Sequence, residues 1–194
     1  MILLYSTDTV FMTFRVYCDM TGDLWHSGHM AFCAKARAVG ERELERRRHA
    51  SPQQYAGQDA VTIVVGITAD KHLAGYKRRP IMTNAERCSS ARGTRGGDEV
   101  IANVPLITSR AFMDEHRLDL VVHGDDFTED KVKMYYGAAM ARDQYRETSY
   151  TPGISTSDLI RRVIETVGQQ HTHGSSSTRA RDLAIVGCAA GVVG

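Results

Sequence analysis

The sequence lacks any apolar run that approaches the roughly 20 residues needed to cross a bilayer. Its first residues, MILLYSTDTVFMTF, carry no early basic cluster and no small-residue cleavage site, so no signal peptide is expected. The formal net charge is only +1, which gives no electrostatic reason to expect nucleic acid or an acidic membrane as the main partner. These absences favour a globular protein located in the cytoplasm.

Cysteine is also sparse, and the sequence contains no CxxC pair, no P-loop GxxxxGK[ST] and no dinucleotide-binding glycine fingerprint. The scattered cysteines predict reduced, partly buried thiols in a reducing compartment rather than a disulfide framework. The missing glycine motifs exclude a P-loop protein and argue against NAD binding. The length of 194 residues fits one domain, with tails. The four cysteines are Cys18, Cys33, Cys88 and Cys188.

Short apolar segments alternate with helical patterns through most of the chain. This alternation predicts an α/β fold, a Rossmann-like parallel sheet with helices on both faces, and ligands of such sheets bind at the carboxyl ends of the strands. The strongest strand is VTIVVGIT, nearly all β-branched, as expected when both faces are buried. The expected strands are 14–18, 61–68, 98–104 and 118–124, and the expected helices are 29–39, 83–92, 109–117, 128–142 and 155–167.

Two stretches flank the expected domain of residues 14–167, and a third is inserted within it. Residues 1–13 form an N-terminal extension, and residues 168–194 are expected to be a flexible tail because they are rich in Gly, Ser and Thr. Gly40 is expected to end the first helix as its C′ residue. The charged and polar stretch 41–60 is then an insertion, for which a helical extension followed by a loop is one possibility.

Two histidines open the first helix, in the stretch GDLWHSGHM directly after the first strand. Three interpretations stay open for HSGH. A metal pair would need further ligands, and no Glu lies between the histidines as it does in HExxH. The pair could instead be two polar residues of a loop and a first helical turn. In the third interpretation, imidazole donors and the amides of the helix start bind a phosphate, and Gly28 lets the backbone approach it.

Several segments taken together resemble the cytidylyltransferase family. They are RVYCDMTGDLWHSGH (15–29), TIVVGITADKHLAGYKRRPIMTNAER (62–87), DEVIANVP (98–105), LDLVVHGDD (118–126) and YRETSYTPGISTSDLIRRV (145–163), in the order typical of the family. The pairing of HSGH with GISTSD is the most specific feature. HxGH alone would also fit adenylyltransferases and class I aminoacyl-tRNA synthetases.

The resemblance implies an HxGH-type nucleotidyltransferase that transfers CMP from CTP to a phosphorylated alcohol and releases pyrophosphate. Among family members the chain looks most like those that use phosphoethanolamine. Choline-phosphate or glycerol-3-phosphate enzymes of the same fold, and a catalytically silent nucleotide-binding protein, are the alternatives. The resemblance further implies a homodimer and Mg²⁺ carried with CTP, with no metal ligands supplied by the protein. Neither nucleic acid nor a membrane-binding helix is expected.

The resemblance also implies roles for particular residues. His26, His29 and Lys77 are the expected catalytic residues, which contact the phosphates of the substrates. Asp19 is expected to bind the ammonium group of the alcohol, and Lys77 its phosphate. The nucleotide is expected to contact Gly28, Arg87, Asp126, Gly153, Ile154, Ser155, Thr156 and Ser157. The sequence departs from the family pattern at Tyr150, where an arginine usually stands.

Overall fold

The computed structural model describes residues 12–73, 78–94 and 96–173. A five-stranded parallel sheet forms its centre, with strand order β3-β2-β1-β4-β5. The strands are β1 (Phe14–Met20), β2 (Val61–Thr68), β3 (Glu99–Val104), β4 (Leu120–Gly124) and β5 (Tyr145–Thr148). The helices are α1 (Ser27–Ala50), α2 (Asp70–Leu73), α3 (Asn84–Arg92), α4 (Arg110–Glu115), α5 (Glu129–Met140) and α6 (Thr156–His173).

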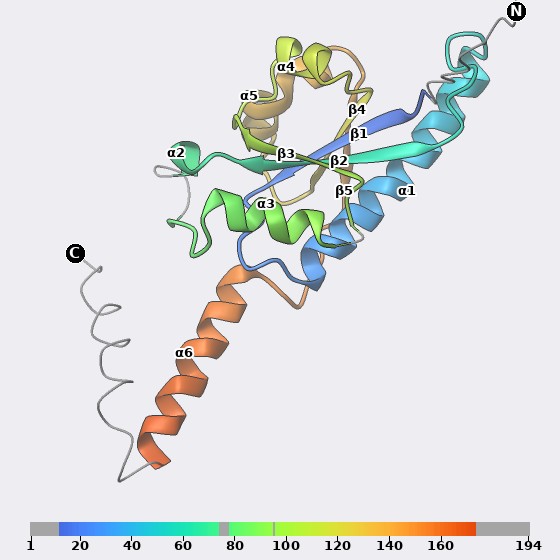
Figure 1. Ribbon diagram of the computed structural model, residues 1–194. Helices are drawn as coiled ribbons and strands as arrows, with labels where there is room; N and C mark the ends of the chain where they lie inside the picture. The colour runs from blue at the N-terminus through green and yellow to red at the C-terminus, as the bar shows by residue number, and fades with distance from the viewer. Residues whose placement is uncertain (1–11, 74–77, 95, 174–194) are drawn as a thin grey trace, which may run out of the picture. The chain divides into compact units, whose positions relative to one another are not determined.

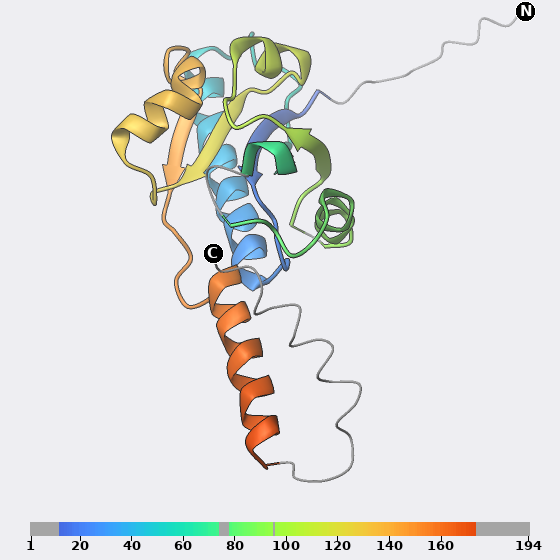
Figure 2. The same ribbon diagram turned by 90° about the vertical axis from the view of Figure 1, so that its left-hand side faces the viewer.

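Helices cover both faces of the sheet, which confirms the predicted α/β architecture (Figure 1). Alternate residues of β1 point to opposite faces, as strand geometry requires. Phe14, Val16 and Cys18 pack in the core with residues of α1 and α3. Tyr17 packs on the other face, with Met113 of α4 and residues of α5. The view turned by 90° shows the same two layers around the strands (Figure 2).

The first helix runs past Gly40, so the predicted C′ role of this glycine is wrong. Gly40 is buried inside α1, and a Cβ there would lie 2.5 Å from Val16 Cγ2 and 3.2 Å from Val61 Cγ1. The glycine therefore lets α1 approach the sheet closely rather than ending the helix. Residues 41–50 continue the helix, and residues 51–60 form the loop that follows, which is one of the forms expected for the insertion.

Ion pairs explain why the charged residues 41–50 stay helical. Glu43 is buried and accepts hydrogen bonds from Arg46 and Arg47, one helical turn further on, and from Arg146 of β5. Burial disfavours the charged form of Glu43, but the hydrogen bonds from the arginines hold the pKa of this carboxyl below its ordinary value. This network attaches the end of α1 to the last strand.

The short strand β5, with the sequence YRET, was not among the predicted strands. It is polar and half-exposed, and its place at the sheet edge comes from pairing with β4. Within the described residues, no helix is long and apolar enough to cross a membrane.

The chain divides into two units, residues 1–156 and residues 157–194. In the second unit, α6 extends beyond Val167, its expected end, to His173. Val163 and Ile164 of this helix are exposed. Residues 174–194 lie outside the described part of the chain, so the tail beyond His173 stays a prediction.

Candidate active site

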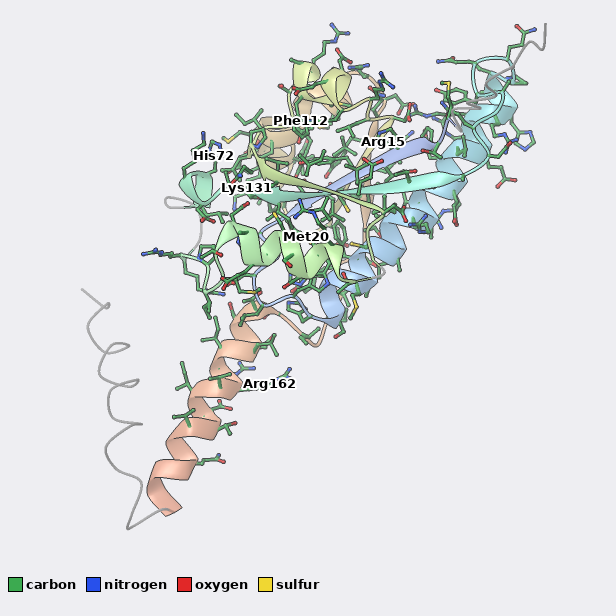
Figure 3. All side chains as sticks on the ribbon, in the orientation of Figure 1. Arg15, Met20, His72, Phe112, Lys131 and Arg162 are labelled. Carbon is green, nitrogen blue, oxygen red and sulfur yellow. The ribbon has the colours of Figure 1, made fainter. Side chains whose placement is uncertain are left out.

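The strand order reverses next to β1, because β2 and β3 follow on one side of it and β4 and β5 on the other. In open α/β sheets, ligands bind at such a switch point, beyond the carboxyl ends of the strands. Arg15 and Met20, labelled in Figure 3, mark the two ends of β1. The HSGH segment follows from the Met20 end and starts α1, so it lies at the edge of the sheet where a ligand site is expected.

The two histidines cap the start of α1 with their own side chains. Nδ1 of His26 accepts a hydrogen bond from the Gly28 N–H (3.1 Å), and Nδ1 of His29 accepts one from the His26 N–H (3.2 Å). An imidazole nitrogen that accepts carries no proton, so each neutral ring is protonated at Nε2. Burial lowers the pKa of His26, which further favours its neutral form. Each ring therefore has an Nε2–H donor.

Ring stacking fixes the orientation of this pair. The centroids of His26 and His29 are 3.9 Å apart, and the Trp25 ring stacks on His29 at 4.9 Å. The helix-start interpretation of HSGH is thus correct, and it is compatible with the phosphate interpretation because the cap uses Nδ1, whereas a phosphate would be contacted through Nε2–H. The metal interpretation gains no support, since the described part of the chain contains no group of three His, Cys, Asp or Glu side chains suited to a metal.

Gly28 is required by close packing at the helix start. A Cβ at this position would lie 2.9 Å from Cε1 and Nδ1 of His26 and 3.2 Å from Cγ2 of Ile154. The first distance is shorter than real side chains allow, so any larger residue would displace the His26 ring. The distance to Ile154 shows that the GIST segment (153–156) lies against the HSGH segment, although more than 120 residues separate the two in sequence.

A hydrogen bond also joins the GIST segment to the loop that precedes HSGH. The Thr156 hydroxyl donates to the carbonyl oxygen of Asp23 at 2.9 Å. Gly153 has φ +90°, a left-handed conformation that favours glycine and allows the chain to turn before Ile154. Gly153, Ile154, Ser155 and Thr156 thus approach the histidine loop as one segment, whereas Ser157 belongs to the second unit and its role stays a prediction.

Asp23 is a buried residue of this site that the sequence did not indicate. Its carboxylate accepts hydrogen bonds from the N–H groups of Ile81 and Met82 and from Nη2 of Arg78, at 2.9–3.1 Å. Burial opposes ionisation, but these donors hold the pKa of Asp23 below its ordinary value. The carboxylate thereby attaches the loop that follows Lys77 to the HSGH segment. Lys77 itself lies outside the described residues.

Asp19 and Asp126 lie at the carboxyl ends of the neighbouring strands β1 and β4, Asp19 within the last two residues of its strand and Asp126 just after its own. Asp19 is near the end of β1 and accepts a hydrogen bond from the Tyr136 hydroxyl at 2.9 Å. Asp126 follows β4, where its Oδ1 is 3.8 Å from Nδ1 of His123 and its side chain is 47% exposed. Both residues are therefore at the carboxyl-end edge of the sheet, from which the HSGH segment also follows.

Arg87 does not have the setting that a direct phosphate ligand requires. Its side chain is fully buried, and its guanidinium donates to the carbonyl oxygens of Thr21 and Thr68 and to the Asp70 carboxylate. Thr21 follows β1, Thr68 is the last residue of β2 and Asp70 comes shortly after it, so Arg87 joins the carboxyl ends of two neighbouring strands. The nucleotide contact of Arg87 stays a prediction, and the structure gives this side chain a buried role that links the ends of β1 and β2.

A lysine that no sequence motif indicated binds the backbone of the loop before the GIST segment. Lys35 of α1 donates to the Ser149 carbonyl at 2.9 Å and to the Tyr150 carbonyl at 3.3 Å. The Tyr150 N–H donates to Asp125 Oδ1 at 2.8 Å. The backbone at Tyr150 is thus held by hydrogen bonds from two sides, while its side chain is exposed.

The chain belongs to the cytidylyltransferase-like family, whose sequence profile matches residues 49–162. It is 30% identical over 172 residues to the ethanolamine-phosphate cytidylyltransferase of Mus musculus, which covers 88% of this chain and 37% of the mouse protein. It is also 32% identical over 158 residues to the choline-phosphate cytidylyltransferase 2 of Arabidopsis thaliana, which covers 80% of this chain and 46% of the plant protein. The chain thus spans less than half the length of these curated relatives.

A solved structure supports the fold. The lipopolysaccharide core biosynthesis protein from Thermoplasma volcanium superimposes with a TM-score of 0.52 and 14% sequence identity, over 74% of this chain and all of that one. Because relatives of both the ethanolamine and the choline type are similar to this chain, family membership alone leaves the alcohol substrate open.

Proposed function

We propose that this chain transfers CMP from CTP to phosphoethanolamine, giving CDP-ethanolamine and pyrophosphate. The observation that carries the proposal is the meeting of the HSGH and GIST segments at the switch point of the sheet, where Ile154 lies against Gly28 and Thr156 bonds to Asp23. A site built from two such segments offers hydroxyl, amide and imidazole donors to one polyphosphate.

The reaction is an in-line displacement at the α-phosphorus of CTP. A phosphate oxygen of phosphoethanolamine forms the new P–O bond, and the bond to the bridging oxygen of pyrophosphate breaks. No covalent intermediate with the protein is needed, so catalysis consists of positioning and of stabilising negative charge. The Nε2–H donors of His26 and His29 supply that stabilisation as charge builds on the phosphate oxygens. Lys77 adds a cation for the phosphates.

CTP enters with Mg²⁺ as part of the substrate. Hard phosphate oxygens and water are the ligands that Mg²⁺ prefers, so a dedicated protein cage is not required. The protein is therefore expected to supply no metal ligand of its own, and Asp126 is assigned to the nucleotide.

The choice of phosphoethanolamine rests on the chemistry of Asp19. A primary ammonium has N–H groups that need acceptors, and a carboxylate at the carboxyl end of β1 provides them. A quaternary ammonium has no N–H and is usually held by the open faces of several aromatic rings. Asp19 therefore favours phosphoethanolamine over phosphocholine, and over glycerol 3-phosphate, which has no positive charge.

A substrate panel tests the proposal directly. Pyrophosphate release from CTP should be fastest with phosphoethanolamine when phosphoethanolamine, phosphocholine and glycerol 3-phosphate are compared at equal concentration. Faster turnover of phosphocholine would overturn the assignment of the alcohol. Binding of CTP in calorimetry without turnover of any phospho-alcohol would instead favour a silent nucleotide-binding protein.

Histidine variants test the mechanism in the same assay. His26→Ala should lower kcat by roughly 10²- to 10³-fold, the cost of losing one transition-state donor. His49→Ala is the matched control, since His49 is in the last turn of the same helix and its side chain is 83% exposed. An unchanged rate for His26→Ala would refute the role of the imidazole.

A further inference from the structure

A lysine in the third turn of α1 binds the loop that connects β5 to the GIST segment, residues 149–152 (the β5–GIST loop). Nζ of Lys35 donates to the carbonyl oxygen of Ser149 at 2.9 Å, to the Ser149 hydroxyl at 3.2 Å and to the carbonyl oxygen of Tyr150 at 3.3 Å. An ammonium group has three N–H donors, so these three contacts use its full donor set. Lys35 and Ser149 are 114 positions apart in sequence, and the packing of α1 beside β5 brings them together.

A carboxylate holds the same loop from the neighbouring strand. Asp125 directly follows β4, and its Oδ1 accepts a hydrogen bond from the Tyr150 N–H at 2.8 Å. The Asp125 N–H donates to the carbonyl oxygen of Thr148, the last residue of β5, at 3.0 Å. The start of the β5–GIST loop is thus attached to α1 through a cation and to the end of β4 through an anion.

The GIST segment lies directly beyond this loop and is attached again at its far end. Thr156 bonds to the loop that precedes HSGH, and Ile154 lies against Gly28. Between the two attachments the chain turns at Gly153, which has φ +90°. A segment that is attached at one end only samples more conformations, and a ligand that orders it must offset the lost entropy. The contacts of Lys35 therefore reduce the cost of ordering the GIST segment.

We propose that Lys35 is a positioning residue that holds the GIST segment in the conformation that binds the triphosphate of CTP. The proposal rests on the proposed function, because that function assigns the GIST segment to the nucleotide. Lys35 acts through the β5–GIST loop, since a phosphate would have to displace one of the three protein acceptors from its ammonium. The effect falls on the affinity for CTP rather than on the chemical step, because a bound nucleotide orders the segment itself.

Lys35→Met is the test, because it removes the ammonium and keeps an unbranched side chain of similar helix propensity. Without CTP, amide hydrogen exchange in residues 149–154 should become faster than in wild type, and saturating CTP should slow it again. The KM for CTP should rise about tenfold, the low end for hydrogen bonds to a charged group, because the three contacts are exposed. Both kcat and the KM for phosphoethanolamine should stay within about twofold of wild type.

Two further variants serve as controls. Lys133→Met removes a lysine of α5 that is 58% exposed and pairs with Glu129 on the same helix, and it should change none of these values. Lys35→Arg keeps a cation with several N–H donors at the same position, and it should keep the KM for CTP within about threefold of wild type. Thermal unfolding of each variant confirms that folded proteins are compared.

Three results would overturn the inference. An unchanged KM for CTP in Lys35→Met would show that the contacts with the β5–GIST loop do not affect nucleotide binding. A raised KM with unchanged hydrogen exchange would mean that the lysine contacts the nucleotide directly. A lower Tm with parallel rises in both KM values would mean that Lys35 serves only the stability of the fold.

The inference and the proposed function can fail separately, because hydrogen exchange and calorimetry with CTP require no turnover. A wild-type protein that binds CTP but turns over no phospho-alcohol would refute the proposed reaction. Weaker binding of CTP to Lys35→Met, with faster exchange in residues 149–154, would in that case still support the role of Lys35. A wild-type protein that turns over phosphoethanolamine while Lys35→Met behaves like wild type would refute the role of Lys35 alone.

Discussion

The substitution Gly28→Ala tests the geometry of the site with the smallest possible change. The added methyl carbon would lie 2.9 Å from two atoms of the His26 ring and 3.2 Å from Ile154 Cγ2. The ring must move, since real Cβ atoms do not tolerate the first distance. Its movement breaks the hydrogen bond from the Gly28 N–H to Nδ1 and disturbs the stack with His29.

The expected effect on activity is large, and the expected effect on stability is small. Loss of the N-cap costs about 1 kcal/mol, and replacing Gly by Ala within a helix returns about 1 kcal/mol of helix propensity. The free energy of unfolding should therefore change by less than about 1 kcal/mol. Displacing the His26 donor should lower kcat by about 10²-fold or more, since transition-state donors must be placed accurately.

Pyrophosphate release and urea unfolding measure the two quantities on the same samples. Gly137→Ala is the matched control, because Gly137 is also a helix residue and no atom lies within 4 Å of a Cβ built there. It should stabilise the protein by up to about 1 kcal/mol and leave kcat unchanged. If Gly28→Ala behaves like Gly137→Ala, the placement of His26 does not limit the reaction and the mechanism above is wrong.

Two further predictions concern stability. Gly40→Ala places a Cβ 2.5 Å from Val16 Cγ2 and should lower the free energy of unfolding by about 1–3 kcal/mol in urea titrations, whereas a gain in stability would show that α1 can move away from the sheet. Glu43→Gln should cost about 3 kcal/mol at pH 7, because it breaks a buried ion pair. Since the folded pKa of Glu43 is depressed, its contribution is present above its ordinary value of about 4.5 and is lost as the pH falls through the folded pKa. The difference in Tm between variant and wild type should thus shrink below about pH 4.5, and a constant difference would contradict the ion-pair explanation.

The sequence alone determined the elements whose signals are local. The β-branched run VTIVVGIT identifies a strand buried on both faces, and it is the inner strand β2, between β3 and β1. The sequence also predicted a helix that starts near Thr83. The Thr83 hydroxyl accepts a hydrogen bond from the Glu86 N–H, only three residues further on, so this N-cap signal is local. The sequence likewise predicted that HSGH lies between a strand and a helix. Ligand-binding motifs of parallel sheets occur at the carboxyl ends of the strands, and HSGH directly follows an apolar strand pattern.

Only the tertiary structure decided which distant residues meet. The sequence pattern predicted that Gly40 ends the first helix. In the structure Gly40 lies inside α1, where the absence of a side chain allows close packing against Val16 and Val61. Arg87 was expected to contact the nucleotide, yet its side chain is fully buried and donates to carbonyl and carboxylate acceptors at two strand ends. The bond from Tyr136 to Asp19 spans over a hundred residues. Local patterns carry no information on such partners, because burial and hydrogen bonding depend on the packing of α1, α3 and α5 against the sheet.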